Sequence, residues 1–371
     1  MTNSRTVNTE AQSAQPNGRT QTRTKTRERT ITLEDDVDEL IGAYQRQGQP
    51  LVAITYKTPS FGSAKQVYRS VDKVRESEST LADQLGAHKR TEREMLREYG
   101  YENVPVLLRP IEAMRRRFMI SEEDTLEHIA RIGAFYADSL EELNGTLNTV
   151  LKEYERASSK VEAYVVHLED QRVSLADQKD SVNRQLEAIE HVKEEYIASA
   201  PHEGTYAEKV LWKRGLRAIE KDERSLRSLK LRVTQDLNQA TEHHTIALQL
   251  AEGLEVSYTM NAMAVSTSEM LTDHLRMNID AYVTSSKASD HAIRIHTYLE
   301  KAAGFSSLMS QATSERMSTV GRMFERFTLP KGKGAQDIAR GGLLDGLKGY
   351  LGQMQDAHDA VSDTYERDLL P

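Results

Sequence analysis

The distribution of proline is the feature that most constrains the fold of this chain. Two long stretches contain none, one between Pro110 and Pro201 and the other between Pro201 and Pro330. A proline inside a helix costs about 3 kcal/mol, so both stretches permit very long helices. Apolar residues recur alternately three and four positions apart over residues 126–196, and a similar pattern covers 226–258. We therefore predict an all-α protein dominated by an elongated antiparallel coiled-coil hairpin, with additional helices packed near its base.

The bend of this hairpin is predicted at residues 200–205. Thr205 and Glu208 have the spacing of a capping box, which marks the start of a helix. A short loop between two long helices favours antiparallel neighbours, and the first helix would be on the order of 110 Å long. If the bend is centred there, Tyr154 should lie opposite Leu250.

The remaining segments are assigned from composition and periodicity. Residues 1–30 are poor in apolar side chains and carry six arginines and lysines against two glutamates, which is typical of a disordered basic arm. The predicted order is the arm (1–30), short helices and a connector (31–120, including a helix over 63–99), the hairpin (121–284), a further helix (285–329), and a Gly-rich linker with a C-terminal amphipathic helix (330–371).

Two stretches depart from a regular apolar seam. The seam over 63–99 is interrupted by polar residues, among them Glu78. After Tyr258 the seam becomes rich in methionine, at positions Met260, Met263, Met270 and Met277. Methionine at helical spacing indicates interior packing where several helices converge, and an adaptable binding surface is the alternative.

Motifs for chemistry are missing or poorly spaced. The chain has no cysteine, which excludes disulfides, thiolate catalysis and cysteine metal sites. It has neither a phosphate-binding P-loop nor a GxSxG elbow. The histidine pairs His243 with His244 and His291 with His296 do not share one helix face, as a metal site on a helix would require. We predict no catalytic, cofactor-binding or metal-binding residues, and no enzyme activity.

Two segments are candidate contact sites. Arg115, Arg116 and Arg117 form a basic cluster near the predicted base of the hairpin, which could contact an anionic surface or pair with acidic helices. The C-terminal segment combines an apolar face with four glycines, Gly342, Gly346, Gly349 and Gly352. Its apolar face is expected to dock on the protein's own helices, with contact to a membrane surface and disorder of the segment as the alternatives. This face comprises Leu343, Leu344, Leu347, Tyr350 and Leu351.

Targeting signals are not evident in the sequence. It has no run of eighteen apolar residues, and its first thirty residues lack the apolar core of a secretory signal. We therefore predict a cytoplasmic protein without a transmembrane helix.

The run MLTDHLRMNIDAYV, within residues 270–283, resembles the toxic-anion-resistance proteins associated with tellurite, which are mostly helical. The Pro-Trp pair that follows such a run in that family is missing here, because Ile279 is followed by Asp280, Ala281 and Tyr282. The resemblance implies a role in resistance to toxic anions, and no site residue is carried over from it.

These observations favour a non-enzymatic coiled-coil scaffold or spacer that associates with itself or with protein partners through helices. We expect a homo-oligomer and no cofactor. Nucleic acid is not an expected partner, because the formal net charge is −8. The alternatives are a peripheral membrane-associated protein that remodels membranes, and a toxic-anion-resistance protein.

Overall fold

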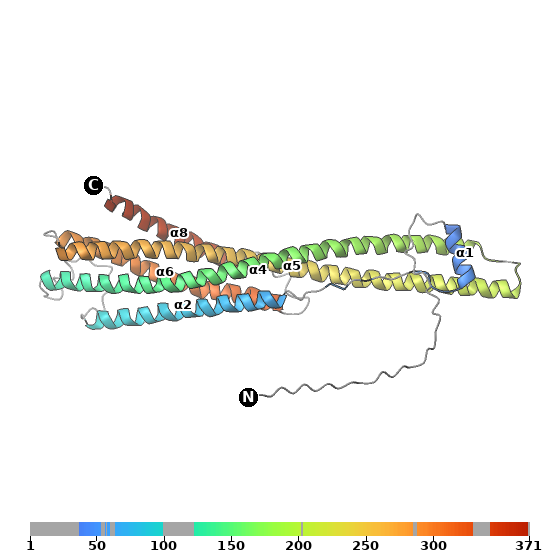
Figure 1. The fold of residues 1–371 in the computed structure, drawn as a ribbon, viewed down its shortest axis with the longest axis horizontal. Helices are drawn as coiled ribbons and strands as arrows, with labels where there is room; N and C mark the ends of the chain where they lie inside the picture. Colours follow the sequence, from blue (N-terminus) through green and yellow to red (C-terminus); the bar gives the residue numbers. More distant parts are fainter. Residues whose placement is uncertain are drawn as a thin grey trace, which may run out of the picture. The chain divides into compact units, whose positions relative to one another are not determined.

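The computed structural model describes residues 37–52, 56, 58–59, 64–98, 122–201, 203–284, 288–328 and 342–369. All six elements in these ranges are α-helices, so the predicted all-α class is confirmed (Figure 1). The predicted basic arm and the cluster Arg115–Arg117 lie outside the described residues. Regular coiled-coil packing along the whole length of the long helices stays a prediction.

The chain divides into two compact units. Unit 1 combines the chain up to Tyr56 with Ser181–Lys230, and unit 2 combines Lys57–Asp180 with Leu231–Pro371. Two helices, α4 (Glu122–Ala198) and α5 (Tyr206–Thr284), contribute to both units.

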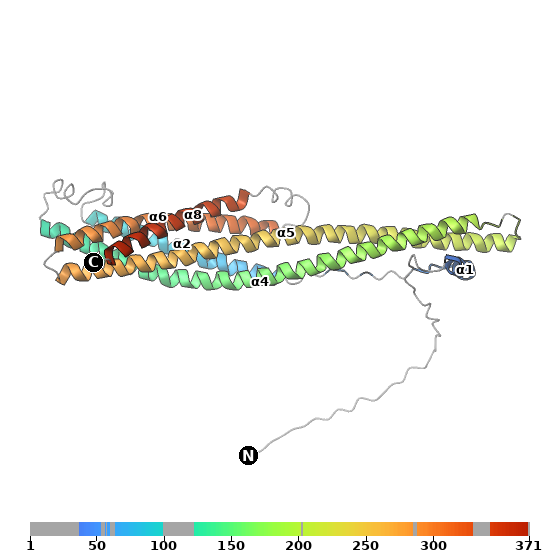
Figure 2. The same cartoon turned by 90° about the horizontal axis from the view of Figure 1, so that it is seen from above.

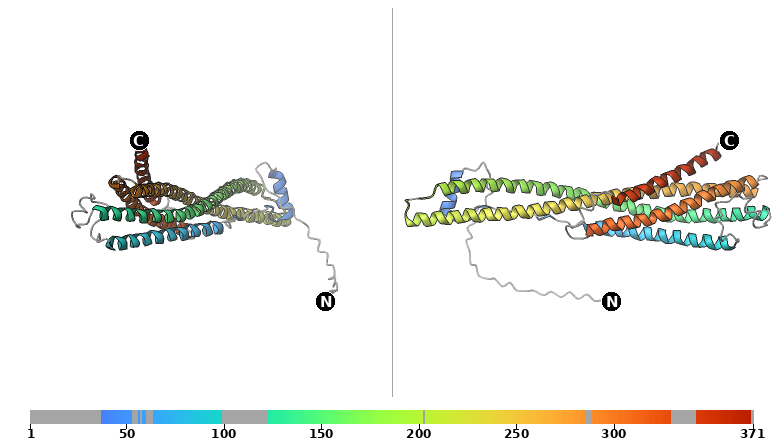
Figure 3. Two further views of the ribbon diagram at one scale, coloured as in Figure 1. Left: turned by 60° about the vertical axis from the view of Figure 1, so that its left-hand side comes forward. Right: turned by 180° about the vertical axis from the view of Figure 1, so that it is seen from behind.

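Unit 1 consists of α1 (Val37–Gln47) lying across the adjoining ends of α4 and α5 (Figures 1 and 3). One buried carboxylate, that of Asp222 on α5, fixes α1 and the segment after it. It accepts hydrogen bonds from the Tyr44 hydroxyl at 2.7 Å, the Leu51 amide at 2.8 Å and the Val52 amide at 3.3 Å. Gly48 ends α1 in the left-handed conformation (φ 54°), which glycine adopts without strain.

The turn between α4 and α5 has the predicted capping box. The Glu208 carboxylate accepts a hydrogen bond from the Thr205 amide at 2.7 Å, and the Thr205 hydroxyl accepts one from the Glu208 amide at 3.3 Å. Just inside the turn, the rings of Tyr196 and Trp212 stack at 5.9 Å. Each of these two side chains also donates a hydrogen bond to the other residue's carbonyl oxygen, which ties the two helices together.

The register of α4 against α5 differs from the prediction. In an antiparallel pair, the residue numbers of facing positions have a constant sum, so a pairing of Tyr154 with Leu250 would also place Tyr196 opposite Glu208. In unit 1, however, Tyr196 lies against Gly215. Unit 2 has the same offset, since Gly133 packs against Ile279. The predicted pairing is therefore wrong by about two helical turns. The reason is that α5 begins beyond the end of α4, and Gly215 is its first buried residue.

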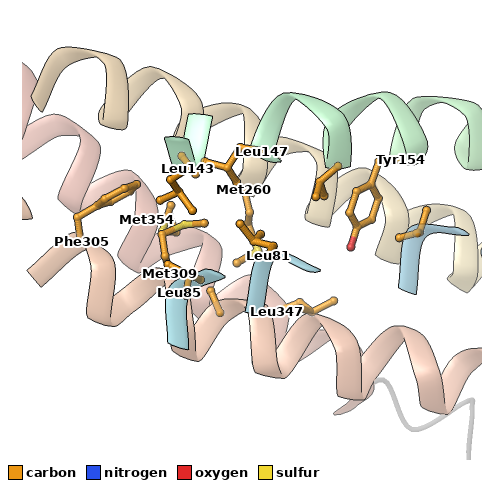
Figure 4. Packing of buried hydrophobic residues seen from close by; sticks show 14 of the residues in the cluster. Leu81, Leu85, Leu143, Leu147, Tyr154, Met260, Phe305, Met309, Leu347 and Met354 are labelled. Atoms are coloured by element: carbon orange, nitrogen blue, oxygen red, sulfur yellow. The ribbon is translucent and has the colours of Figure 1, made fainter. Parts of the chain in front are cut away.

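Unit 2 contains α2 (Ala64–Glu98), α6 (Ala288–Thr328) and α8 (Gly342–Leu369), packed with the rest of α4 and α5 (Figure 2). Its apolar core receives side chains from all five helices, as Figure 4 shows. The labelled residues there are Leu81 and Leu85 of α2, Leu143, Leu147 and Tyr154 of α4, Met260 of α5, Phe305 and Met309 of α6, and Leu347 and Met354 of α8.

The methionine-rich part of α5 lies within this core. Met260 is fully buried, and Met263 and Met270 are partly buried against the core, whereas Met277 is 44% exposed. Interior packing therefore accounts for three of these methionines. Small polar residues such as Ser257, Asn261 and Ser268 occupy the same buried stripe, which lets neighbouring helices approach α5 closely.

Substitution of Gly215 by alanine should destabilise unit 1. A Cβ at this position would clash with the Tyr196 hydroxyl and lie 3.2 Å from the Tyr44 carbonyl oxygen. We expect a loss of about 1–3 kcal/mol in the free energy of unfolding, measured by urea denaturation. Gly86→Ala is the control, because a Cβ there meets nothing within 4 Å. It should gain up to about 1 kcal/mol from helix propensity. Equal effects of the two substitutions would contradict the described packing.

Candidate functional site

The most distinctive polar cluster in unit 2 is built from two charged residues in otherwise apolar seams. On α2 the buried positions include Val67, Val71, Val74, Glu78, Leu81 and Leu85. On α6 they include Ala302, Phe305, Met309, Ala312, Arg316 and Val320. Each seam thus has one charged residue where the spacing calls for an apolar one. Glu78 is the negative charge on α2, and Arg316 is the positive charge on α6. Their side chains are 2% and 0% exposed.

Glu78 and Arg316 form a bidentate ion pair. Arg316 Nε donates to Glu78 Oε1 at 2.9 Å, and Nη2 donates to Oε2 at 3.2 Å. The Tyr154 hydroxyl of α4 donates to Oε1 at 2.9 Å, and Asn261 Nδ2 of α5 donates to it at 3.3 Å. Thr313 accepts a further hydrogen bond from Arg316 Nη2 at 2.9 Å. Four helices therefore converge on one carboxylate.

Burial and charge shift the titration of the groups around this carboxylate. Burial, followed by the negative charge of Glu78, raises the pKa of Tyr154 well above its ordinary value. Burial alone would lower the pKa of Arg316, but Glu78 and Tyr154 outweigh it and the pKa of Arg316 is raised. Tyr154 therefore stays neutral and Arg316 stays charged, as the hydrogen bonds require.

The cluster is suited to fixing the helices rather than to binding a substrate. A group that is 0–2% exposed cannot be reached from solvent while the helices stay packed. Removing one partner of a buried ion pair leaves an uncompensated charge, which is far more costly than losing a surface pair. The pair therefore selects the one arrangement of α2, α4, α5 and α6 in which both charges are compensated.

The C-terminal helix α8 docks on α6 and α5 through most of the face predicted from the sequence. Leu347 is fully buried and Leu344 is 8% exposed. Tyr350 and Leu351 are half-buried against the same core, and the side chain of Leu343 lies outside the described residues. These apolar side chains therefore contact protein in the folded chain.

Polar contacts hold α8 at several levels. Lys348 pairs with Glu252 of α5 at 2.7 Å, and Lys301 of α6 donates to the Thr364 hydroxyl. Near the C-terminal end, the buried ring of His274 on α5 stacks on Tyr298 of α6 at 4.6 Å. The His274 ring also makes an edge-to-face contact with the ring of Tyr365 on α8, with 4.4 Å between the ring centroids. These contacts fix both the position and the rotation of α8.

The glycines of α8 contribute less to docking than their number indicates. A Cβ on Gly346 would lie 3.0 Å from Glu315 Oε1, so α6 approaches closely at this position. At Gly342, Gly349 and Gly352 a Cβ would meet nothing within 4 Å. Of the four glycines, only Gly346 is therefore in close contact with a neighbouring helix, because the other three face open space.

A small cavity of 280 Å³ lies in unit 2 between α4 and the segment that precedes α2. Thr58 and Pro59 form one wall, and the other is a single face of α4: His167, Asp170, Gln171, Ser174, Leu175 and Gln178. Gln171 hydrogen-bonds His167 at 3.1 Å, and Gln178 donates to Ser174 at 3.3 Å. Because these polar groups bond along their own helix, we assign the cavity to the seating of the preceding segment against α4.

The histidines considered for metal binding lie in separate surroundings. His244 is 3.4 Å from Glu169 of α4, and His291 contacts Asn278. Among the described residues, no cluster of three or more histidine, aspartate and glutamate side chains could hold a metal ion. Nor is any of the described helices both long and apolar enough to cross a membrane.

Sequence reasoning noted Glu78 as a polar interruption but missed its partner. The available signal was the single arginine in the apolar spacing of residues 302–320, opposite in sign to the single glutamate in the apolar spacing of residues 67–85. A buried charge requires a compensating partner. Two predicted seams that each contain a single charged residue, of opposite sign, can therefore be expected to pack against each other.

Comparison with known proteins adds no relative. No family model, no curated protein sequence and no solved structure matches the chain.

Removing one charge of the buried pair should cost more than removing both. Arg316→Met leaves the Glu78 carboxylate buried without its ion pair, and we expect a loss of about 3–5 kcal/mol in unfolding free energy. The double variant Glu78→Leu with Arg316→Met should recover most of that loss. Urea denaturation followed by circular dichroism measures both. A double variant as unstable as Arg316→Met would argue against charge compensation.

Alkaline pH should destabilise unit 2 through Tyr164. Burial, and to a lesser extent Tyr68, raises the pKa of Tyr164 to about 12. In the unfolded chain a tyrosine titrates near pH 10. The contribution of neutral Tyr164 to the free energy of unfolding is therefore fully present below pH 10 and is lost as the pH rises toward 12. Tyr164→Phe should lessen the fall of the melting temperature between these values, whereas Tyr206→Phe, at a side chain 86% exposed, should leave it unchanged.

Proposed function

We propose that this protein is a non-enzymatic helical scaffold that binds a partner helix along the solvent face of α4 in unit 2. The observation that carries the proposal is a pair of valines one heptad apart. Val166 is 61% exposed and Val173 is 54% exposed, whereas Tyr164, Leu168 and Leu175 on the opposite side of the helix are buried.

The charges beside these valines indicate the chemistry of the partner. Glu162 and Asp177 are exposed and lie along the same side of α4. Two further exposed acids lie there, Glu169, which pairs with Arg172, and Asp170, at the edge of the cavity. In helix pairs, apolar residues at heptad spacing form the seam and the flanking charges select the partner. Two copies of this face would place like charges together, so a partner with basic flanks fits better than self-association through this face.

The packing of unit 2 supports a scaffold. The Glu78–Arg316 pair and the contacts of α8 use polar side chains to fix helices against one another, which provides a rigid support for an exposed helix face. Self-association through other faces stays a prediction, and so does a role in toxic-anion resistance.

A synthetic helical peptide with leucine at heptad positions and lysine at the flanks tests the proposal. We expect Val166→Ser with Val173→Ser to weaken its binding about tenfold, because two partly exposed valines would be buried on association. Fluorescence titration of the labelled peptide with the full chain measures the dissociation constant.

Two controls make the result specific. A peptide with glutamate at the flanks should bind poorly, since it would face the acidic residues of α4. Val283→Ser with Ile293→Ser changes two other exposed apolar residues, 76% and 55% exposed, and should leave binding of the lysine peptide unchanged. Equal binding of the two peptides, or equal effects of the two double variants, would refute this assignment.

A further inference from the structure

The start of α5 projects beyond the end of α4 in unit 1 and exposes apolar side chains there. The last buried residue of α4 is Tyr196, and the first buried residue of α5 is Gly215. Between them Tyr206 is 86% exposed, Leu211 is 49% exposed and Ile197 is 48% exposed. Because α4 has ended, none of the described helices covers Leu211, although it lies on the side of α5 that faces α4 farther along. These three residues form the apolar tip.

The outward side of α5 next to the apolar tip is basic. Six exposed side chains recur three or four residues apart on the side opposite Gly215, Ala218 and Ile219. They are Lys209, Lys213, Arg214, Arg217, Lys221 and Arg224. Arg224 pairs with Glu220 at 3.5 Å, and the other five make no ion pair within the part of the chain that the structure describes. We refer to these six residues as the basic face.

Apart from Glu220, which pairs with Arg224 of the basic face, three acidic residues of this part of α5 are engaged elsewhere. Asp222 accepts the hydrogen bonds of α1, and Glu223 pairs with Lys193 at 2.7 Å and with Arg227 at 2.6 Å. Glu208 is held by the capping box. The exposed acids Glu194 and Glu195 belong to α4, so the tip of unit 1 has a basic helix beside an acidic one.

We propose that the start of α5 binds the surface of an anionic lipid bilayer end-on, with the apolar tip inserted and the members of the basic face nearest to it, Lys209 and Lys213, at the headgroups. Aliphatic and aromatic side chains beside lysine and arginine suit the boundary between headgroups and acyl chains, where the apolar groups insert and the long basic side chains reach the phosphates. A nucleic acid would use the basic face but leaves Leu211 and Ile197 without a role. Membrane contact is thereby placed on unit 1, since the apolar side chains of α8 pack against protein.

This activity goes beyond the scaffold role and does not depend on it, because it uses a different helix and a different unit. The two surfaces also differ in charge, so their ligands should not compete. A scaffold with both surfaces would hold its partner helix at an anionic membrane.

Trp212 provides a direct test, because it is the only tryptophan of the chain and follows Leu211. On titration of the full chain with vesicles of phosphatidylcholine and phosphatidylserine, its emission should shift to shorter wavelength and be quenched by brominated acyl chains. Vesicles of phosphatidylcholine alone should cause neither change. Vesicle binding without any change in Trp212 emission would overturn the proposal, as would equal binding to both kinds of vesicle or none to either.

Vesicle flotation of variants assigns the residues. Lys213→Glu with Arg217→Glu should reduce binding about tenfold or more, and Tyr206→Ser with Leu211→Ser should reduce it severalfold. Lys152→Glu with Lys160→Glu is the matched control, because it makes the same change in net charge at exposed lysines of unit 2. Circular dichroism confirms that each variant is folded.

Two results in these variants would overturn the proposal. A control that loses as much binding as the charge reversal of the basic face would mean that net charge, and not the tip of unit 1, governs binding. Unchanged vesicle binding with loss of duplex DNA binding, measured by fluorescence anisotropy, would identify the basic face as a nucleic-acid surface.

Discussion

The packing of unit 2 depends on the compensation of one buried positive charge by one buried negative charge. Placing either Glu78 or Arg316 alone in an apolar interior would cost several kcal/mol. Each residue interrupts a seam that is otherwise apolar, so α2 and α6 can pack only in a register that brings the interruptions together. Tyr154 and Asn261 then complete the hydrogen bonds of the Glu78 carboxylate and include α4 and α5 in the same constraint.

Unit 1 uses the same principle on a smaller scale. The Asp222 carboxylate accepts hydrogen bonds from the buried Tyr44 hydroxyl and from two half-buried backbone amides. Burial, together with Asp222, raises the pKa of Tyr44, so this hydroxyl remains a donor over the ordinary pH range. In both units a single carboxylate determines where a shorter helix docks: Asp222 of α5 positions α1, and Glu78 of α2 positions α2 against its neighbours. Within the described residues, the start of α5 and one side of α4 in unit 2 stay exposed.

Those two exposed surfaces carry opposite charges, and this difference separates the two proposed activities. The solvent face of α4 in unit 2 combines valines with acidic residues, and the start of α5 in unit 1 combines an apolar tip with basic residues. Each combination selects a ligand of the opposite charge through the same physical effects, burial of apolar surface and electrostatic attraction. Under the two proposals, a basic helix and an anionic bilayer would be recognised by separate parts of one chain.

The sequence by itself determined the local features of this protein. Missing prolines and three-four spacing predicted long helices, and Thr205 with Glu208 predicted where α5 begins, because caps and periodicity depend only on residues a few positions apart. The tertiary structure decided the pairing of Glu78 with Arg316, the offset of α4 against α5, and which glycine of α8 meets another helix. These depend on contacts between residues far apart in the chain, and an apolar seam can slide by whole helical turns and still bury its side chains. Only the meeting of particular side chains, such as Tyr196 with Gly215 or one buried charge with another, selects a single register.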